Sequence, residues 1–419
     1  MSHFSTRRTA MRYALLVAPL AVGLTSCGGD GGDPLAASPY DAAGEVSYSL
    51  ADGGKVDPNK PLEITAKNDD RITDVTATDA AGRYVRGELS PDGIRWHSTA
   101  PLAAGAHYTV RVSTEDGAGR PGRETVGFDT TAADNLLRVT FGPDAGTYGV
   151  GQPVTAMLTV PVKDPAARAK VEQNLQVTAS PEAAVGSWYW VDDRTLHYRP
   201  ETFWPANAKI EVRSTLDGVH IKDSLYGGSS KALSLTTGDR VEAITDAGSH
   251  EMTFKRNGSV VRTIPVTTGK PGFSTRNGVK VVLGKESFVR MQSESIGIAA
   301  GSSEGYDLPV YWATRVTWSG EYVHAAPWSE GSQGVDNVSH GCTGMSTENA
   351  HWFFDQVRMG DVVQVVNSAG STMTPFDNGF GDWNLNWSDW KKGSALGSAG
   401  KAAAVQNNTA APARLRPEV

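Results

Sequence analysis

The chain has 419 residues, including 46 glycines, 22 prolines and only two cysteines. This length is enough for two or three domains, and the glycine and proline content favours a turn-rich, mainly β fold. A formal net charge of −7 without a run of basic residues argues against nucleic acid as a partner.

The first 26 residues have the pattern of a secretory signal peptide. Arg7, Arg8 and Arg12 precede the apolar stretch YALLVAPLAVGL, which is too short to span a bilayer. LTSC, from Leu24 at the end of this stretch to Cys27, resembles a bacterial lipobox, which implies cleavage before Cys27 and a diacylglycerol thioether on its sulfur. An ordinary signal peptide with a chance cysteine is the alternative, and the arginine pair leaves export by the Sec or the twin-arginine route open. We expect a lipid-anchored protein on the outer face of the cell membrane, towards the cell wall.

Short alternating strands separated by turn residues fill the chain from about residue 45 to 239. Tyr108 and Val110 in HYTVRV share one face of a strand, and Ile210 and Val212 repeat this pattern 102 residues later. Two copies of a unit of about 100 residues match the size of an immunoglobulin-like (Ig-like) sandwich, here without a disulfide. A stalk is the expected role of these two units, and a binding surface is the alternative.

The C-terminal part begins with further strand signals and contains one convincing helix. The pair Asn257-Gly258 between two alternating runs predicts a hairpin, and another such pair follows at residues 277–278. Ser346 can cap the helix and Gly360 can end it. The apolar side of the helix is formed at i, i+3, i+4 and i+7 by Ala350, Phe353, Phe354 and Val357. The apolar run DVVQVV after it predicts a buried strand.

The second cysteine, Cys342, becomes a free thiol outside the cell if Cys27 carries a lipid. A buried cysteine that acts as a small apolar residue is the alternative. Its neighbours are polar or lack a side chain, which predicts a loop: Ser339, His340, Gly341, Thr343 and Gly344. A loop between a sheet and a helix can hold a reactive side chain on rigid elements.

A cysteine nucleophile needs a base, and two histidines lie close to Cys342 in the sequence. His340 is two residues away, so both side chains would point the same way in an extended segment. His324 lies at the end of a strand-like run, with fourteen residues between it and Ser339. We favour His324 as the base and His340 as a support of the loop, and spacing alone leaves both open.

The segment from His324 to Cys342, H-x14-S-H-G-C, resembles the signature of the L,D-transpeptidase (YkuD-type) catalytic domain. The segments YWATRVTWSGEYVHAAPWS, NAHWFFDQVRMGDVVQVVN and GDWNLNWSDW extend this resemblance to cell-wall L,D-transpeptidases with a lipobox and tandem Ig-like domains. The chain departs from the pattern at Gly344, because many members have Asn there. Gly344 can offer only its backbone to a substrate.

The resemblance implies the site residues. Cys342 would be the nucleophile, and His324, oriented by the carbonyl of Ala325, would be the proton donor and acceptor. His340 would support the loop, and Tyr306 would help to form the oxyanion hole, with a packed loop aromatic as its alternative role. The substrate cleft would be lined by Tyr306, Ser319, Gly320, Ser339, Gly341, Gly344, Met291 and Trp328. Met291 would belong to a flap or fill the core, and Trp328 would pack the loop between the two motif halves.

The resemblance also implies the reaction. A peptidoglycan tetrapeptide stem would acylate Cys342 and release D-alanine, and the side-chain amine of a second stem would form a 3→3 cross-link. No metal or organic cofactor is implied, and we expect a monomer that carbapenems acylate better than penicillins. An L,D-carboxypeptidase, in which water replaces the amine, and a wall-binding lipoprotein with an inactive domain are the alternatives.

The tryptophans near the C-terminus can be a carbohydrate platform or an anchor for the tail, and we favour the anchor.

The expected fold is mainly β, with two Ig-like sandwiches and a β-rich YkuD-type catalytic domain with one main helix after the cysteine. The expected organisation is a signal peptide at 1–26, a flexible tether at 27–44, Ig-like domains at 45–133 and 134–238, the catalytic domain at 239–367, a subdomain with Trp383, Trp387 and Trp390 at 368–395, and a disordered tail at 396–419.

Overall fold

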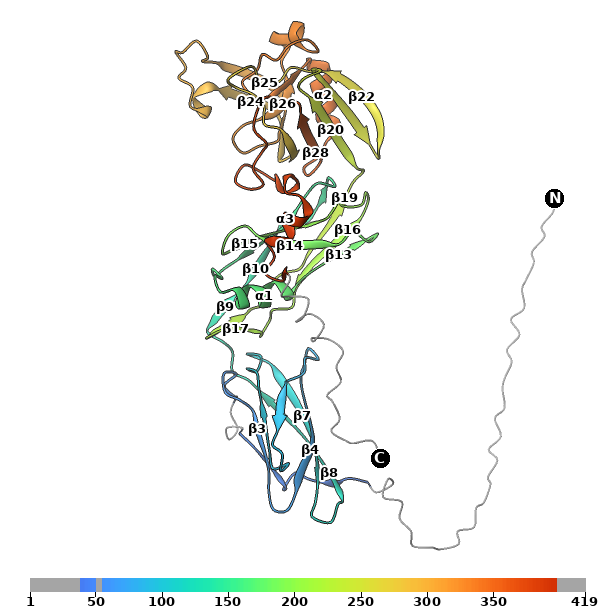
Figure 1. The fold of residues 1–419 in the computed structure, drawn as a ribbon, viewed down its shortest axis with the longest axis vertical. Helices are drawn as coiled ribbons and strands as arrows, with labels where there is room; N and C mark the ends of the chain where they lie inside the picture. Colours follow the sequence, from blue (N-terminus) through green and yellow to red (C-terminus); the bar gives the residue numbers. More distant parts are fainter. Residues whose placement is uncertain (1–37, 50–54, 398–419) are drawn as a thin grey trace, which may run out of the picture.

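A computed structural model describes residues 38–49 and 55–397. The signal peptide, Cys27 and the tail from residue 398 lie outside these described residues. The described chain forms three bodies stacked along one axis, two β-sandwiches followed by a larger β-rich body (Figure 1). The mainly β fold is therefore as predicted. None of the helices in the described part is long and apolar enough to cross a bilayer.

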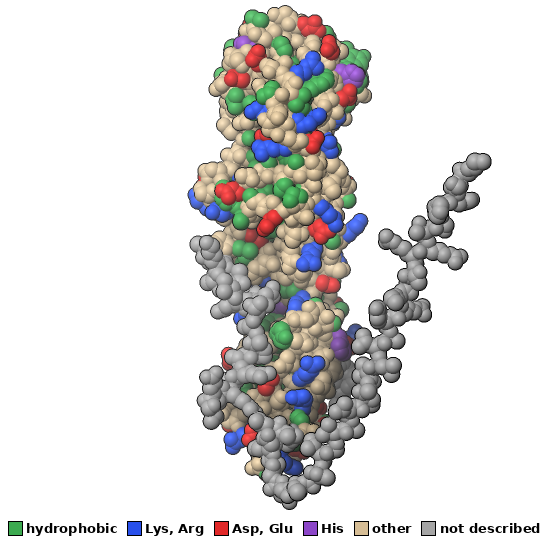
Figure 2. Space-filling model, turned by 90° about the vertical axis from the view of Figure 1, so that its right-hand side faces the viewer, with side chains coloured by type: hydrophobic (Ala, Val, Ile, Leu, Met, Phe, Trp, Pro, Cys, Tyr) green, Lys and Arg blue, Asp and Glu red, His purple; other side chains and the backbone are tan. Residues whose placement is uncertain are grey.

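Charged side chains of both signs are interspersed on the face of the molecule that Figure 2 shows. Nucleic-acid binding needs basic side chains gathered into a patch or stripe. This face therefore carries no such stripe.

The first sandwich packs two four-stranded sheets, in the orders β1-β8-β7-β4 and β2-β3-β6-β5. Tyr108, Val110 and Val112 of β7 are all buried, so the predicted alternation does point one face into the core. The strands are β1 (Tyr40–Asp41), β2 (Val46–Tyr48), β3 (Glu63–Ala66), β4 (Arg71–Asp79), β5 (Gly87–Leu89), β6 (Arg95–Ser98), β7 (His107–Glu115) and β8 (Pro121–Asp129).

Strand β1 lies inside the segment 27–44 that we expected to be a flexible tether. It runs parallel to β8, with Tyr40 opposite Gly122. The Tyr40 ring also occupies the space beside Gly122, where an added Cβ would lie 2.5 Å from the ring. The folded first sandwich therefore begins before residue 45.

The second sandwich repeats the strand order of the first, as β11-β19-β16-β13 and β10-β12-β15-β14. The segments related by the 102-residue offset occupy equivalent places, because β15 corresponds to β6 and β16 to β7. A small sheet β17-β18-β9 lies at its end. The strands are β9 (Asn135–Leu137), β10 (Val139–Gly142), β11 (Thr147–Tyr148), β12 (Val154–Leu158), β13 (Leu175–Ser180), β14 (Gly186–Trp190), β15 (Thr195–Pro200), β16 (Lys209–Ser214), β17 (His220–Lys222), β18 (Leu225–Gly227) and β19 (Leu233–Thr237).

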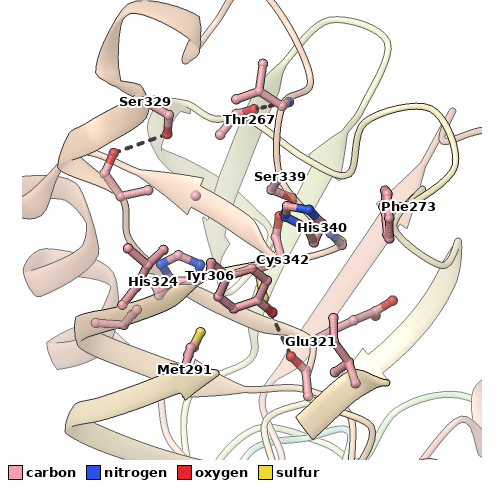
Figure 3. Close-up of a pocket in the computed structure, with 18 of the residues that line it drawn as sticks. Thr267, Phe273, Met291, Tyr306, Glu321, His324, Ser329, Ser339, His340 and Cys342 are labelled. Atoms are coloured by element: carbon pink, nitrogen blue, oxygen red, sulfur yellow. Dashed lines mark hydrogen bonds between the residues drawn. The ribbon is translucent and has the colours of Figure 1, made fainter. Parts of the chain in front are cut away.

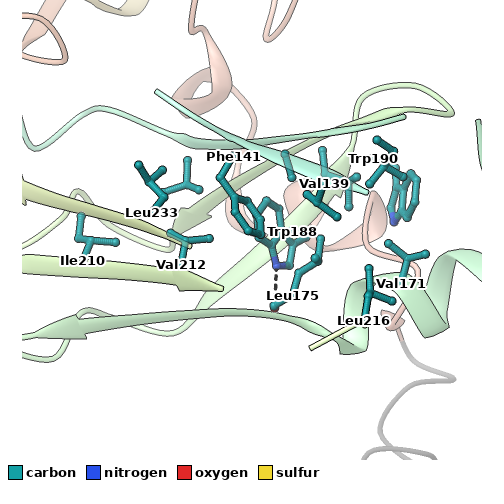
Figure 4. Packing of buried hydrophobic residues seen from close by; sticks show 14 of the residues in the cluster. Val139, Phe141, Val171, Leu175, Trp188, Trp190, Ile210, Val212, Leu216 and Leu233 are labelled. Atoms are coloured by element: carbon teal, nitrogen blue, oxygen red, sulfur yellow. Dashed lines mark hydrogen bonds between the residues drawn. The ribbon is translucent and has the colours of Figure 1, made fainter. Parts of the chain in front are cut away.

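Large aromatic side chains fill the core of the second sandwich, which has no disulfide (Figure 4). Trp188 and Trp190 point inward from β14, and the Nε1–H of Trp188 donates to the carbonyl of Leu175 at 3.2 Å. A buried indole contributes a large apolar area, provided that its N–H finds an acceptor. This sandwich is therefore stabilised mainly by apolar burial and not by a disulfide between its sheets.

The third body contains a five-stranded sheet, β22-β21-β20-β28-β23, and a four-stranded sheet, β24-β25-β26-β27. Val362 and Val363 of β28 are buried, as the apolar run predicted. The strands are β20 (Val241–Asp246), β21 (Glu251–Arg256), β22 (Ser259–Pro265), β23 (Gly278–Val281), β24 (Gly284–Gln292), β25 (Asp307–Arg315), β26 (Tyr322–Ala325), β27 (Thr343–Met345) and β28 (Val362–Val366). The helices are α1 (Pro165–Gln173), in the second sandwich, α2 (Thr347–Gln356) and α3 (Trp387–Lys392), and the short 3-10 helices are η1 (Ser293–Ile296), η2 (Pro327–Ser332) and η3 (Asp382–Asn384).

Helix α2 begins where the sequence predicted and ends earlier. The Ser346 side chain accepts a hydrogen bond from the Asn349 N–H, so the cap is confirmed. Val357 is already extended, with φ −108° and ψ 155°, and Gly360 has φ +86° in the turn before β28. The glycine therefore belongs to the next turn of the chain.

The two Asn-Gly pairs have different structures. Asn257 and Gly258, with φ 49° and 85°, join β21 and β22 in the predicted hairpin. Asn277 makes no such turn. Its side-chain amide donates instead to the carbonyls of Ser368 and Gly370. It ties the start of β23 to the chain that follows β28.

The C-terminal segment returns from the third body to the second sandwich. Trp390 is 0% exposed, and its Nε1–H donates to the carbonyl of Ser187 at 2.9 Å. The Arg199 guanidinium lies over the rings of Trp383, Trp387 and Trp390, at 4.9, 5.5 and 4.5 Å from their centroids. We expected these tryptophans to anchor the tail onto the catalytic domain. They anchor it onto the second sandwich instead, because Arg199 and Ser187 both belong to that sandwich.

The second sandwich and the third body are also joined directly. The N–H groups of Gly149 and Gly151 donate to the carbonyls of Met359 and Gly360, at 2.8 and 2.9 Å. A Cβ on Gly149 would lie 2.1 Å from the backbone nitrogen of Asp361, so only glycine permits this approach. The second sandwich therefore meets the third body at the turn just before β28.

Candidate active site

A cleft of about 720 Å³ is lined by residues of β24, β25, β26 and β27 and of the loops near them (Figure 3). The structure brings together on it every site residue that the sequence indicated within the third body. These residues are Met291, Tyr306, Ser319, Gly320, His324, Trp328, Ser339, His340, Gly341, Cys342 and Gly344.

The loop that carries Cys342 is fixed by hydrogen bonds to its own backbone. The Ser339 hydroxyl donates to the carbonyl of Cys342 at 2.7 Å and accepts from the N–H of Gly341 at 3.1 Å. Thr275 donates to the carbonyl of Gly341, whose φ of +123° favours glycine. The Cys342 thiol lies 3.6 Å from the carbonyl oxygen of Gly320. These contacts hold the sulfur towards the cleft.

His324 lies on β26, which pairs in parallel with β27 and places His324 opposite Gly344. Its Nδ1 lies 2.8 Å from the carbonyl oxygen of Ala325. A carbonyl can only accept, so Nδ1 carries the hydrogen and the Nε2 lone pair remains available. The ring is buried, next to Cys342 and Tyr306 in the cleft (Figure 3).

His340 has a different partner. Its Nε2 lies 2.7 Å from a carboxylate oxygen of Glu304, which also accepts from Lys270 at 2.5 Å. A carboxylate accepts only, so the Nε2 of His340 donates, and this nitrogen is not available as a base. Lys270 and His340 hold the pKa of Glu304 below its usual value. Of the two histidines that spacing left open, this geometry favours His324 as the base.

Three aromatic and apolar side chains border the reactive groups. The Tyr306 ring packs 5.1 Å from the ring of His340, and burial raises the pKa of its hydroxyl. Met291 reaches the cleft from β24. Trp328 was expected to pack a loop, but it is 51% exposed and its ring lies 6.0 Å from that of His324. It forms a wall of the cleft.

Gly344 has no room for a side chain. A Cβ there would lie 2.9 Å from the Cβ of Ala326 and 3.1 Å from a methyl group of Thr267. The backbone of Gly344 also exchanges two hydrogen bonds with that of Thr267. An Asn at this position would require these neighbours to move.

The comparisons with known proteins agree with this geometry. Residues 240–365 match the family described as the L,D-transpeptidase catalytic domain, and residues 53–220 match the bacterial Ig domain. The chain is 34% identical to L,D-transpeptidase 2 of Mycobacterium tuberculosis, over 93% of this chain and 96% of that protein. The chain belongs to the L,D-transpeptidase family.

Two further similarities lie within the same family. L,D-transpeptidase 5 of Mycobacterium tuberculosis is 31% identical, over 87% of this chain and 80% of that protein. A solved L,D-transpeptidase from Mycobacterium smegmatis is 38% identical and covers 55% of this chain and 99% of its own, with a TM-score of 0.46.

In this member of the L,D-transpeptidase family, burial sets the protonation of both reactive groups. Burial raises the pKa of Cys342 to about 11, with a smaller contribution from the Glu321 carboxylate. Burial also lowers the pKa of His324 below its ordinary value of 6.5. At neutral pH the site therefore holds a thiol beside a neutral imidazole, and a thiol that acts as a nucleophile would first have to lose its proton.

Sequence reasoning missed a group of three charged residues at the floor of the cleft. The Lys280 ammonium lies 2.5 Å from one Glu321 oxygen, and the Arg276 guanidinium lies 3.0 Å from the other. Lys280 sits in the short apolar strand β23, with its side chain 1% exposed. A lysine inside an apolar strand needs a buried partner of opposite charge. The segment GVKVV could therefore have predicted a buried ion pair at Lys280. The identity of that partner did not follow from the sequence.

Proposed function

We propose that this protein is an L,D-transpeptidase that forms 3→3 cross-links between peptidoglycan stem peptides through a thioester on Cys342. The observation that carries the proposal is His324. Its Nδ1 is held by the Ala325 carbonyl, and it lines the same cleft as the Cys342 thiol. A neutral imidazole with a fixed tautomer is the form that can accept a thiol proton.

Acylation comes first in the proposed reaction. The Nε2 of His324 takes the proton of Cys342, and the sulfur attacks the carbonyl of the third residue of a tetrapeptide stem. The amide bond to D-alanine breaks, and the D-alanine amine takes its proton from the imidazolium. His324 then deprotonates the side-chain amine of a second stem, which attacks the thioester and releases the thiol.

The oxyanion formed in both steps needs donors that are free in the resting site. The N–H of Gly341 already donates to the Ser339 hydroxyl. We therefore assign the oxyanion to the N–H of Cys342 and the hydroxyl of Tyr306. Burial raises the pKa of Tyr306, so this hydroxyl keeps its proton. A single donor of this kind is often worth about 3 kcal/mol of transition-state stabilisation.

Incubation with a disaccharide-tetrapeptide, followed by mass spectrometry, tests the proposed reaction. Transfer to an amine gives a dimer that has lost one D-alanine. Transfer to water gives the tripeptide, which would make the protein an L,D-carboxypeptidase. Recovery of unchanged tetrapeptide from the folded protein would contradict both activities and favour a wall-binding role.

The pH dependence should report the two buried groups. We expect kcat/KM to stay constant from about pH 7 to 9. It should fall only below pH 6.5, because burial lowers the pKa of His324 from that value and raises that of Cys342 to about 11. A preformed thiolate–imidazolium pair would instead lose activity at moderately alkaline pH. A kcat/KM profile with circular dichroism at each pH checks this, and a decline near pH 8 in the folded protein would contradict it.

We also propose that the protein is a monomer held at the outer face of the cell membrane by a lipid on Cys27. The two Ig-like sandwiches would then act as a spacer between the membrane and the cleft. The cleft would then lie at the far end of the stack, towards the stem peptides of the wall.

Replacing Cys27 by alanine should release the protein from the membrane. The lipid would be lost, while the cleft lies at the other end of the chain, so cross-linking by the purified protein should stay unchanged. Detergent phase partitioning of cells that express each form checks the anchor. A Cys27→Ala protein that still enters the detergent phase would show that the lipobox assignment is wrong.

A further inference from the structure

The charged group at the floor of the cleft has one uncompensated positive charge. Lys280 and Glu321 are both buried and lie 2.5 Å apart. Burial lowers the pKa of Lys280, and Glu321 opposes this shift. The pair has a net charge of zero whether the shared proton lies on the nitrogen or on the oxygen. The charge of Arg276, which stays protonated in proteins, is therefore left over.

Arg276 is held so that part of its guanidinium stays available. Its Nη1 donates to Glu321 at 3.0 Å and to the Ser319 hydroxyl at 3.3 Å. Its backbone N–H donates to the same Glu321 oxygen at 3.1 Å, which fixes the base of the side chain. Within the described residues, no side chain accepts from its Nε or Nη2. The side chain is 40% exposed and lines the cleft.

Arg276 is also the only lysine or arginine among the described residues that line the cleft. The one carboxylate on the lining, Glu321, is already paired. The free edge of this planar guanidinium, formed by Nε and Nη2, is suited to bind a carboxylate through parallel hydrogen bonds. An anionic peptide group is thus the ligand chemistry that this position fits.

We propose that Arg276 binds a carboxylate of the donor stem peptide next to the amide that Cys342 attacks. Arg276 contacts Ser319 and Glu321, which flank Gly320, and the carbonyl of Gly320 lies 3.6 Å from the Cys342 sulfur. On this proposal, the carboxylate is carried by one of the two residues that the scissile amide joins.

Two carboxylates of the donor meet this condition. One is the terminal carboxylate of the D-alanine that leaves, and the other is the side-chain carboxylate of the diaminopimelate in third position. Both present the same chemistry to Arg276. This inference rests on the proposed function, because it takes a stem peptide as the ligand.

Binding to the full chain that carries Cys342→Ala tests the inference without turnover. Calorimetry would measure the Kd of three tetrapeptides: the free acid, the terminal D-alanine amide and the third-residue side-chain amide. Arg276→Gln removes the charge, and Arg276→Lys keeps it without the planar fork. Arg290→Gln is the matched control, because Arg290 pairs with Asp307 on the β24–β25 hairpin and does not line the cleft.

We expect Arg276→Gln to weaken binding of the free acid by about ten-fold, which corresponds to about 1.4 kcal/mol. Arg276→Lys should recover part of this loss, and Arg290→Gln should leave the Kd unchanged. Amidation of the carboxylate that Arg276 binds should weaken binding to the parent by a similar factor. Arg276→Gln should then cause no further loss with that peptide, which identifies the carboxylate.

An equal loss with all three peptides would overturn the inference, because Arg276 would then act only by supporting the loop. An unchanged Kd for the free acid, or no binding by the parent, would overturn it as well. Circular dichroism and melting curves of each variant separate these outcomes from misfolding. The proposed function fails by a different result, namely no dimer from the same tetrapeptide when Cys342 is intact.

Discussion

Replacing Cys342 by alanine is expected to abolish cross-linking, with a loss on the order of 10⁴-fold or more. The change removes the only nucleophile that the proposed thioester can use. It should leave the fold intact, because the loop is held by the Ser339 hydroxyl and by Thr275, which contact backbone carbonyls and not the sulfur. Mass spectrometry of the disaccharide-tetrapeptide reaction measures the dimer.

A carbapenem gives a second measure of the same substitution. A strained β-lactam carbonyl is an acyl donor, so a thiol activated by His324 should open it and retain the drug as a thioester. The parent should gain the mass of one drug molecule, and Cys342→Ala should gain none. A dimer or an adduct formed by folded Cys342→Ala would show that the chemistry occurs elsewhere, and the site would have to be abandoned.

Replacing Trp390 by alanine is expected to lower the free energy of unfolding by about 3–5 kcal/mol. The indole is fully buried, and its loss would also remove the hydrogen bond to the Ser187 carbonyl. The substitution would release the C-terminal segment from the second sandwich. Differential scanning calorimetry checks this, as a shift of the transition to lower temperature.

Trp318→Ala is the matched control, because Trp318 is 53% exposed. It should change stability by only about 0.5 kcal/mol. A Trp390→Ala protein that melts like this control would contradict the anchor. If that protein also bound isolated peptidoglycan more weakly, the tryptophans would form a carbohydrate platform.

The sequence by itself determined the strand pattern, the repeat and the residues that line the cleft. Alternation along HYTVRV and its recurrence 102 residues later depend only on which side chains avoid water, and this holds in any sandwich. The Ser346 cap and the Asn257-Gly258 turn are local, because each depends on the φ, ψ angles and hydrogen bonds of four or five consecutive residues. The same local signal was present for α1 in Asp164-Pro165, and the sequence analysis overlooked it.

Contacts between distant segments were decided only by the tertiary structure. Spacing alone could not choose between His324 and His340 as the base. The two differ in their partners, because the Nε2 of His340 donates to Glu304, which lies 36 positions earlier in the sequence. The C-terminal tryptophans predicted that this segment packs against another part of the chain, but not which part. In the structure they pack against the second sandwich, where Arg199 lies over the Trp390 ring. Glu321 and Lys280 are 41 residues apart in the sequence, and only the tertiary fold brings their side chains together. A side chain's chemistry is local, whereas the partner that sets its protonation and direction comes from packing of the whole chain.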